Sequence, residues 1–503
     1  MTACPIISSF TFAPLVAAFL IVLTPSTNAR LIKWTALVGS LVSLALVLEA
    51  VFQFNPSGYF QFIEHHAWVP SLRLEYAVAM DGLSLLVVLL TAIIAPISIL
   101  ASWKLKTPEK TKSYFALLSL QFTGLFGAFT ALSFYHWFIF WEMSLIPGFF
   151  LIKLFGGPRR HHAALSFVLF TVLGSIPMLL GFQYLFFKTN TFDFVLLSGM
   201  AHKGLMPSLV GPSYSWIFFA ILLGLIVKVP LFPLHIWQPE TYTQAPAPVS
   251  MIFSALLSKL GVYGFLRIIM FIFPDALEMY ARPLLVLALA TVLLGAFAAL
   301  RQNDLKKLLA YSSLNHVAYC IFGCAVIASY GGHAVIGART IIIQGVILQM
   351  FTHGITVAGL FYLAGILEGK TGTTIFDNCG GLRKNMPRYA TLFSIFAFSS
   401  LGLPFLAGFS SEFLIFYGVF AIKPLVASVA VIALLITALF LLSLLQKLFT
   451  GPLTASCQKL DDISTGQIWI VIPLVVLIFW VGLAPAPFLH YSARVADYIT
   501  SPY

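Results

Sequence analysis

The chain has 503 residues, of which 60% are hydrophobic and only 9% are charged, and its mean hydropathy is +0.97. Soluble domains carry roughly 25% charged residues, so this composition excludes a water-soluble globular protein. The formal net charge of +11 does not indicate a nucleic-acid partner, because basic residues in a membrane chain report topology instead.

Apolar segments follow one another along the whole chain. A hydrocarbon core of about 30 Å requires about 20 apolar residues per helix. We therefore predict an all-α polytopic membrane protein in which residues 1–503 form one transmembrane domain. The first segment has no basic region before it and no small-residue cleavage site, so we interpret it as a retained span. The fourteen expected spans begin near residues 6, 32, 81, 113, 135, 163, 215, 248, 282, 305, 337, 388, 425 and 467.

The basic residues are unevenly divided between the two sides of the membrane. Of the 28 Lys and Arg residues, 18 follow odd-numbered spans and only 8 follow even-numbered ones. Positive charge accumulates on the cytoplasmic side, so the odd-to-even loops are expected there, or in an equivalent compartment. Both termini then lie on the positive, outer side, most simply of a bacterial plasma membrane. The remaining two basic residues, Lys228 and Lys259, fall inside spans.

Two expected spans contain helix-breaking residues near their middle. Pro removes a backbone hydrogen bond and clashes with the preceding turn, and Gly permits unwound backbone. We predict that spans seven and twelve are discontinuous near Lys228 and just before Glu412. The residues responsible are Pro230, Pro233, Pro404 and Gly408.

The two interrupted spans are five spans apart. Because five is odd, a repeat of that length has inverted topology, an architecture in which ion sites form at discontinuous helices. We expect spans four to eight (residues 113–272) and nine to thirteen (residues 282–449) to be the two repeats. Residues 1–112 hold spans one to three, and span fourteen covers residues 467–489.

Six ionisable side chains are expected within the spans. Placing one at the bilayer centre costs about 2.5–3.5 kcal/mol, so each requires a compensating partner or a function. Their distribution over both repeats predicts a lateral proton relay. The six are Glu142, Lys228, Lys259, His316, His353 and Glu412.

Structural interpretations of the same residues remain open. Glu142 and Lys228 could form a purely structural ion pair, and the histidines could be hydrogen-bonded core residues. Arg267 and Lys447 lie near expected span ends, where long basic side chains extend to the membrane surface. Asp81 opens span three and is most simply a helix-terminal carboxylate.

The sequence predicts no metal site and no cofactor site in this chain. The five cysteines contain no Cys-x-x-Cys pair, and no Gly-x-Gly-x-x-Gly stands in a βαβ context. His65-His66 and His161-His162 lie in expected loops without acidic or cysteine companions. The cysteines are Cys4, Cys320, Cys324, Cys379 and Cys457.

Several motifs resemble one family closely. Lys228-Val-Pro-Leu-Phe-Pro-Leu-His235-Ile-Trp237 looks like the span-seven motif of the antiporter-like subunits of respiratory complex I and of Mrp-type antiporters. Glu412, in Gly408-Phe-Ser-Ser-Glu412, resembles the M-type or chain 4 pattern, because the related L- and N-type subunits usually have Lys there. Further matches are Asp81-Gly-Leu-Ser, Trp141-Glu142, Leu257-Ser-Lys259 to Arg267, Asp304-Leu-Lys-Lys and Gln349-Met-Phe-Thr-His353-Gly.

The resemblance implies a proton-translocating subunit of an NADH:quinone oxidoreductase. NADH, FMN, iron–sulfur clusters and quinone would then belong to partner subunits. The partners of this chain would be neighbouring antiporter-like subunits and the lipid bilayer, with no nucleic acid.

The resemblance also implies a role for each titratable residue. Glu142 and Lys228 would act as a switching pair, Lys259 and His316 as the central relay, and Glu412 as the group nearest the exit. A buried lysine loses proton affinity and a nearby carboxylate restores it, so movement of Glu142 relative to Lys228 would change the proton affinity of Lys228.

Three alternatives belong to other classes. The chain could exchange Na⁺ or K⁺ for protons in a Mrp-type assembly. It could serve a membrane-bound hydrogenase, formate hydrogenlyase or ferredoxin-linked complex. It could also be a non-transporting structural subunit, in which case neutralising the buried charges would leave pumping unchanged.

Overall fold

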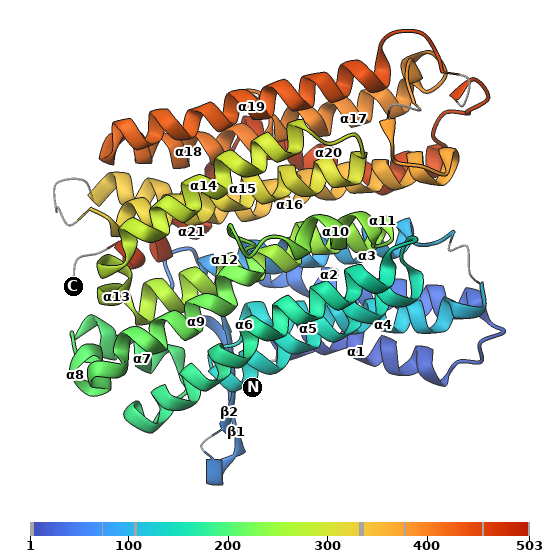
Figure 1. Cartoon of the computed structure of the whole chain (residues 1–503). Coiled ribbons are helices and arrows are strands. Elements are labelled where there is room, and N and C mark those ends of the chain that lie inside the picture. The colour runs from blue at the N-terminus through green and yellow to red at the C-terminus, as the bar shows by residue number, and fades with distance from the viewer. Residues whose placement is uncertain are drawn as a thin grey trace.

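The computed structural model describes residues 5–72, 74–104, 108–330, 336–376, 379–454 and 457–500. Long helices that run side by side make up most of these residues (Figure 1). Twelve helical segments in the described ranges are long and apolar enough to cross a membrane. Cys4 and the basic residues Arg73 and Lys106 lie outside the described residues.

Each of the first eight expected spans has a helical counterpart. Span seven is split into two helices, and span eight is one composite helix in which η4 and η5 are π-helical turns. The counterparts are α1 (Ile6–Leu23), α2 (Ala29–Gln53), α3 (Gly82–Ala101), α4 (Thr111–Thr130), α5 (Phe134–Phe155), α6 (Arg160–Thr189), α9 (Tyr214–Lys228) with α10 (Trp237–Gln244), and α11 (Ala247–Ile252), η4 (Phe253–Leu257), α12 (Ser258–Gly264) and η5 (Phe265–Met270).

The last six expected spans are also present as helices. Span twelve, like span seven, is split into two helices. Short helices connect or flank the spans. The spans are α14 (Ala281–Leu300), α15 (Leu305–Ala328), α16 (Ile336–Thr371), α17 (Pro387–Ser400) with α18 (Ala407–Ile422), α19 (Pro424–Phe449) and α20 (Thr465–Leu483). The short helices are α7 (Phe194–His202), α8 (Met206–Val210), α13 (Pro274–Met279) and α21 (Ala486–Thr500).

The segment before span three contains strands, which the all-α prediction did not include. Strands β1 (Gln61–Val69) and β2 (Leu74–Met80) pair as an antiparallel hairpin with Gln61 opposite Met80. The hairpin projects from the lower side of the molecule in this view, close to the N-terminus (Figure 1). Its last residues are buried, and Val78 among them forms a bridge with Ala131, next to the start of α5.

The C-terminal boundary also differs from the prediction. Span fourteen was expected to continue to residue 489, but α20 ends at Leu483 and a separate helix, α21, follows. Pro485 lies between the two helices, and its missing N–H and fixed φ end the first helix. The new helix packs against α3 and α16 and buries Phe488 and Val495.

Both predicted helix interruptions are confirmed. α9 ends at Lys228 and α10 begins at Trp237, with Pro230 and Pro233 between them. The Trp237 indole N–H donates to the Val227 carbonyl at 3.1 Å. This carbonyl therefore has a hydrogen-bond partner although the helix is interrupted.

The second interruption lies between α17 and α18 and contains Pro404. Gly402 adopts a φ of +75°, a left-handed conformation that favours glycine. The prediction for Gly408 was wrong in detail, because Gly408 lies in the first turn of α18 rather than in the break. A side chain there would collide with the Ser399 carbonyl, so Gly408 permits close packing of the two half-helices.

Matching contacts in the two halves support the predicted repeats. The residue before span five, Ser133, forms a bridge with Asp193 after span six. The residue before span ten, Asp304, forms the corresponding bridge with Ile375 after span eleven. These positions are five spans apart, so they lie at opposite ends of the bundle, as an inverted repeat requires.

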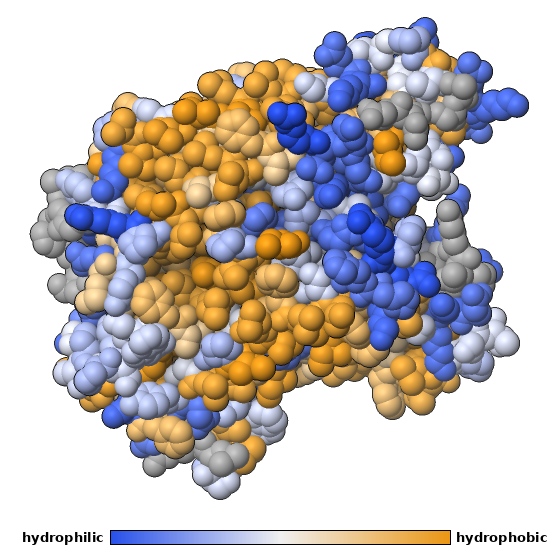
Figure 2. Space-filling view, viewed as in Figure 1, coloured by the Kyte–Doolittle hydropathy of each residue, from blue (hydrophilic) through white to orange (hydrophobic). Residues whose placement is uncertain are grey.

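Hydrophobic side chains cover the middle of the molecule as a broad band (Figure 2). Hydrophilic side chains gather at the right-hand end of this view, where several loops after odd-numbered spans lie (Figure 1). The helices of the second half, α14 to α20, lie above those of the first half in this view, and α10 and α11 contact α15 and α16 between them. The two halves therefore meet at the interrupted span seven and at span eight.

Candidate functional site

The first group of titratable side chains is the half-buried Glu142 on α5 and the buried Lys228 at the end of α9. Lys228 is buried, and its Nζ lies 4.6 Å from the centre of the Trp141 ring. Neither Lys228 Nζ nor Glu142 Oε1 has a hydrogen-bond partner among the described residues. Glu142 directly follows Trp141 in α5, so it lies in the same region as Lys228. The structural ion pair considered from sequence is therefore not formed in this conformation.

The second group starts with Lys259, the second residue of α12, just after the π-helical turn η4. Such turns are frequent at functional sites because they redirect side chains and leave carbonyls open. Lys259 Nζ donates to the Ser254 carbonyl at 2.6 Å and lies 2.6 Å from His353 Nδ1. Lys259 and His353, 94 residues apart in sequence, are therefore in direct contact within the buried interior.

The third group joins His316 on α15 to Glu412 on α18. His316 Nδ1 lies 2.9 Å from Glu412 Oε1, and His316 Nε2 lies 3.2 Å from Ser400 Oγ. An ionised Glu412 can only accept, so it fixes the proton on Nδ1 in the neutral ring. Nε2 is then the acceptor, and the Ser400 hydroxyl donates to it. The break before α18 places Ser400 and Glu412 on either side of the same imidazole.

His353 and His316 connect the second and third groups. Their ring centres are 5.4 Å apart, and Tyr319 and Cys320 of α15 lie beside this region. The space enclosed by Lys259, His316 and His353 is too narrow for a water molecule. A proton that passes from His353 to His316 in this conformation therefore depends on direct approach of the two rings.

Two glycines allow close packing at the helix breaks. A Cβ on Gly261 would lie 2.9 Å from the backbone N of Val229, so α12 packs directly on the end of α9. A Cβ on Gly402 would lie 2.9 Å from Glu412 Oε2. The unwound backbone thus lies next to Lys228 in one half and next to Glu412 in the other.

Arg267 corrects one expectation from sequence. Its predicted extension to the membrane surface was wrong, because the side chain is buried and its Nη2 pairs with Asp81 Oδ1 at 2.6 Å. Asp81 also accepts from the backbone N–H of Leu83 and Ser84, so it is the helix-terminal carboxylate that was predicted. The ion pair adds a link between η5 and the start of α3.

Lys306 is a further buried cation, one of the 18 basic residues that were counted after odd-numbered spans. Its Nζ donates to the Ala245 carbonyl at 2.7 Å and lies 3.3 Å from Glu368 Oε2. Lys306 therefore joins the start of α15 to the ends of α10 and α16.

Sequence reasoning also missed Ser254 and Ser400. Ser254 stands five residues before Lys259, close enough for its carbonyl to meet the ammonium at a widened helical turn. Ser400 directly precedes the predicted break in span twelve. Proximity to a predicted helix break would have marked Ser400 as a candidate.

The described structure is that of a polytopic membrane protein with interrupted helices and a buried chain of titratable groups, as in ion-translocating membrane proteins. Residues 131–437 match the family described as "NADH:quinone oxidoreductase/Mrp antiporter, TM", and the chain belongs to this family.

Relatives match over nearly the whole chain. The F(420)H(2) dehydrogenase subunit M of Methanosarcina mazei is 34% identical over 99% of this chain and 98% of its own length. The NAD(P)H-quinone oxidoreductase chain 4 1 of Nostoc sp. is 32% identical over 98% of this chain and 91% of its own length.

Solved structures show the same architecture. A chain of respiratory complex I from Thermus thermophilus superimposes with a TM-score of 0.85 at 26% identity, covering 99% of this chain and all of that one (100%). A chain of the Mrp complex from Dietzia sp. superimposes with a TM-score of 0.86 at 21% identity over 100% of this chain and 98% of that one, which shows the shared fold.

Proposed function

We propose that the chain is a proton-translocating, antiporter-like membrane subunit of a quinone oxidoreductase, of the M or chain 4 type. The observation that carries the proposal is the buried series Lys259, His353, His316 and Glu412, in which two direct contacts at 2.6 and 2.9 Å flank one ring-to-ring step. The named relatives, a subunit M and a chain 4, support the type.

Glu142 and Lys228 act as the switch of this proposed mechanism. A buried ammonium without a hydrogen-bond partner is poorly stabilised, and a carboxylate that approaches it stabilises the charge. Movement of Glu142 toward Lys228 would favour the protonated amine, and movement away would favour proton release. The absence of a direct pair in the described residues is the open position of this switch.

The released proton passes along the second group to Glu412. Protonated Lys259 donates to His353 Nδ1, His353 passes a proton to His316, and His316 donates to Glu412. The first and last steps join atoms 2.6 and 2.9 Å apart, whereas the step from His353 to His316 requires the two rings to approach each other. Moving one charge against 100 mV requires about 2.3 kcal/mol, so electron transfer elsewhere in the assembly must supply the energy.

Redox chemistry is assigned to partner subunits in this proposal. NADH, FMN, iron–sulfur clusters and quinone would bind there. Among the described residues, no group of three or more His, Cys, Asp or Glu side chains could hold a metal ion, and the four described cysteines are buried. The relatives' names include different electron donors, so the subunits that copurify with this chain would identify its donor.

The proposed orientation places both termini on the positive side of a bacterial plasma membrane. The 18 to 8 division of basic residues supports it. A reporter protein fused after Tyr503 should score as non-cytoplasmic. A cytoplasmic score would reverse the orientation.

The test of function is Glu412→Gln, which keeps the shape of the side chain but cannot titrate. Proton uptake would be measured in vesicles, normalised to assembled complex and to electrons transferred. We expect normal assembly with severe loss of pumping, and Lys228→Ala should show the same loss as a second blocked site. Glu278→Gln, an exposed carboxylate on α13, is the control. Wild-type pumping by Glu412→Gln would remove Glu412 from the relay.

Sodium dependence separates the proposal from cation exchange. The family also contains Mrp antiporters, which makes this comparison necessary. Proton uptake in the same vesicles should be independent of Na⁺ and K⁺. A pH change that requires either cation would favour the exchanger instead.

A further inference from the structure

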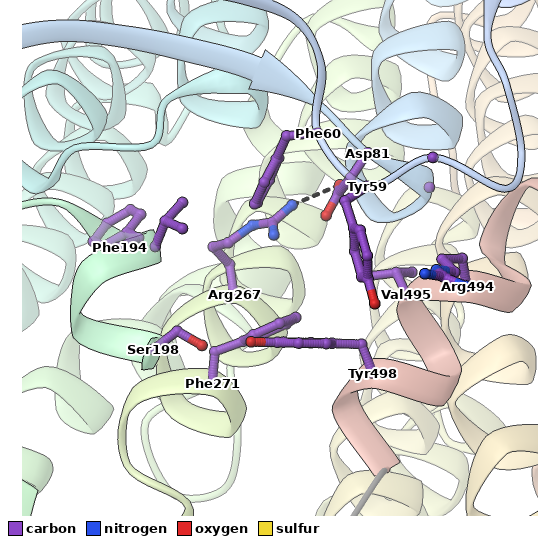
Figure 3. Close-up of a pocket in the computed structure, with 13 residues that line it drawn as sticks. Tyr59, Phe60, Asp81, Phe194, Ser198, Arg267, Phe271, Arg494, Val495 and Tyr498 are labelled. Atoms are coloured by element: carbon purple, nitrogen blue, oxygen red, sulfur yellow. Dashed lines mark hydrogen bonds and ion pairs between the residues drawn. The ribbon is translucent and has the colours of Figure 1, made fainter. Parts of the chain in front are cut away.

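A second pocket lies apart from the buried titratable chain, where the segment before β1, α7, η5 and α21 meet (Figure 3). Its volume is about 290 Å³, at the lower end of the ~300–1,000 Å³ typical of ligand pockets. Three phenylalanines give it a mainly apolar lining. They are Phe60, Phe194 and Phe271.

The charges in the pocket are unbalanced. Arg267 is neutralised by Asp81, and its guanidinium lies over Phe60 and Phe271 at 5.2 and 5.5 Å (Figure 3). Arg494 on α21 is exposed, lies 4.3 Å from the Tyr59 ring centre, and has no acidic partner within the described residues. The mouth of the pocket therefore carries one positive charge.

Ser198 supplies an unused hydrogen-bonding group inside the pocket. Its side chain is 5% exposed, and its Oγ has no hydrogen-bond partner among the described residues. Figure 3 shows the hydroxyl directed toward Phe271 and the interior of the pocket. A buried hydroxyl without a partner is unfavourable, so a ligand that accepts a hydrogen bond from it would be stabilised there.

We infer that this pocket binds an anionic phospholipid. One acyl chain lies against Phe60, Phe194 and Phe271, an ester carbonyl accepts from Ser198, and the phosphate contacts Arg494. The bilayer supplies such a molecule at high local concentration, and the pocket volume holds only the part nearest the headgroup. The lipid would join α21 to α7 and to the segment before the hairpin.

Photo-crosslinking tests this site in the full-length chain within its purified complex. The complex would be reconstituted in phosphatidylcholine vesicles that contain a trace of phosphatidylglycerol with a diazirine in its acyl chain. We expect labelling of peptides from α7 and α21. Phosphatidylcholine with the same diazirine chain should label them about threefold less, the effect of one exposed charge contact. Equal labelling by the two lipids would overturn the assignment of an anionic headgroup.

Two matched pairs of variants locate the site. Arg494→Gln should reduce labelling by the anionic probe to the level of the neutral probe, whereas Arg282→Gln, an exposed arginine at the start of α14, should not. Val195→Trp fills the pocket from a residue that is 43% exposed and should abolish labelling. Leu196→Trp, its neighbour outside the pocket lining and 56% exposed, should leave labelling intact.

Two further outcomes would overturn the inference. Unchanged labelling in Val195→Trp would place the lipid elsewhere. Competition by millimolar inorganic phosphate would show that the site takes a free anion rather than a lipid. Ser198→Ala should weaken labelling less than Arg494→Gln, because it removes one neutral hydrogen bond.

Discussion

The two halves of the molecule hold their titratable groups in different ways. In the first half, Lys228 and Glu142 lie near each other without a hydrogen bond between them. At the junction of the two halves, Lys259 of the first half contacts His353 of the second, and within the second half His316 contacts Glu412. A group without partners can change its position at little cost, whereas each hydrogen-bonded pair keeps its donor and acceptor at a distance suited to proton transfer. The unpaired Glu142 and Lys228 are therefore suited to switching, and the hydrogen-bonded groups are suited to proton conduction.

The largest effect that separates the halves is expected from Lys228→Met. Proton pumping should fall about 100-fold, the lower range for loss of an acid–base group. Stability should change little, because the lost contact with Trp141 is offset by removal of a buried amine that has no hydrogen-bond partner. Vesicle pumping and thermal unfolding of the same preparation would measure both. A large loss of stability would show that Lys228 is structural.

The second half should respond differently to His316→Phe. This change leaves Glu412 without its imidazole donor, so the free energy of unfolding should fall by about 1–3 kcal/mol along with pumping. Thermal unfolding in the detergent used for Lys228→Met provides the comparison. Equal stability of the two variants would contradict the contrast between the unpaired Lys228 and the hydrogen-bonded His316.

Much of this organisation was predictable from the sequence. Long apolar segments fix the spans because each must cross the same hydrocarbon thickness. Pro230 and Pro404 marked the two breaks because proline has the same local effect in any helix. The six titratable residues were found because burial of charge is costly wherever it occurs, but their roles as a relay stay predictions.

The pairing of these residues was not predictable. Lys259 and His353 are 94 residues apart, and Asp81 and Arg267 are 186 apart, so no local pattern records either contact. The position of Arg267 near a span end suggested exposure, but the segment before β1 and α21 enclose it. The hairpin was missed because no element was predicted between spans two and three, where Gln61–Val69 and Leu74–Met80 pair.

Gly402→Ala tests whether the break before α18 positions Glu412. A Cβ at a φ of +75° costs about 1–2 kcal/mol, and it would also lie 2.9 Å from Glu412 Oε2. We expect reduced stability and reduced pumping. Gly372→Ala is the control, since its φ is +74° and nothing lies within 4 Å of an added Cβ. Equal pumping in the two variants would mean that only backbone strain matters.

The smallest expected effect is that of Ser400→Ala, which tests how the second half orients its proton. Ser400 Oγ lies 3.2 Å from His316 Nε2, so its loss should cost about 0.5–1.5 kcal/mol and slow pumping without abolishing it. Ser399→Ala is a close control, because Ser399 is also buried at the end of α17 but bonds Thr356 at 2.9 Å instead. If the hydroxyl fixes the His316 tautomer, Ser400→Ala should shift the pH dependence of pumping, and Ser399→Ala should lower stability alone. Identical pH profiles in both variants would show that Glu412 orients His316 by itself.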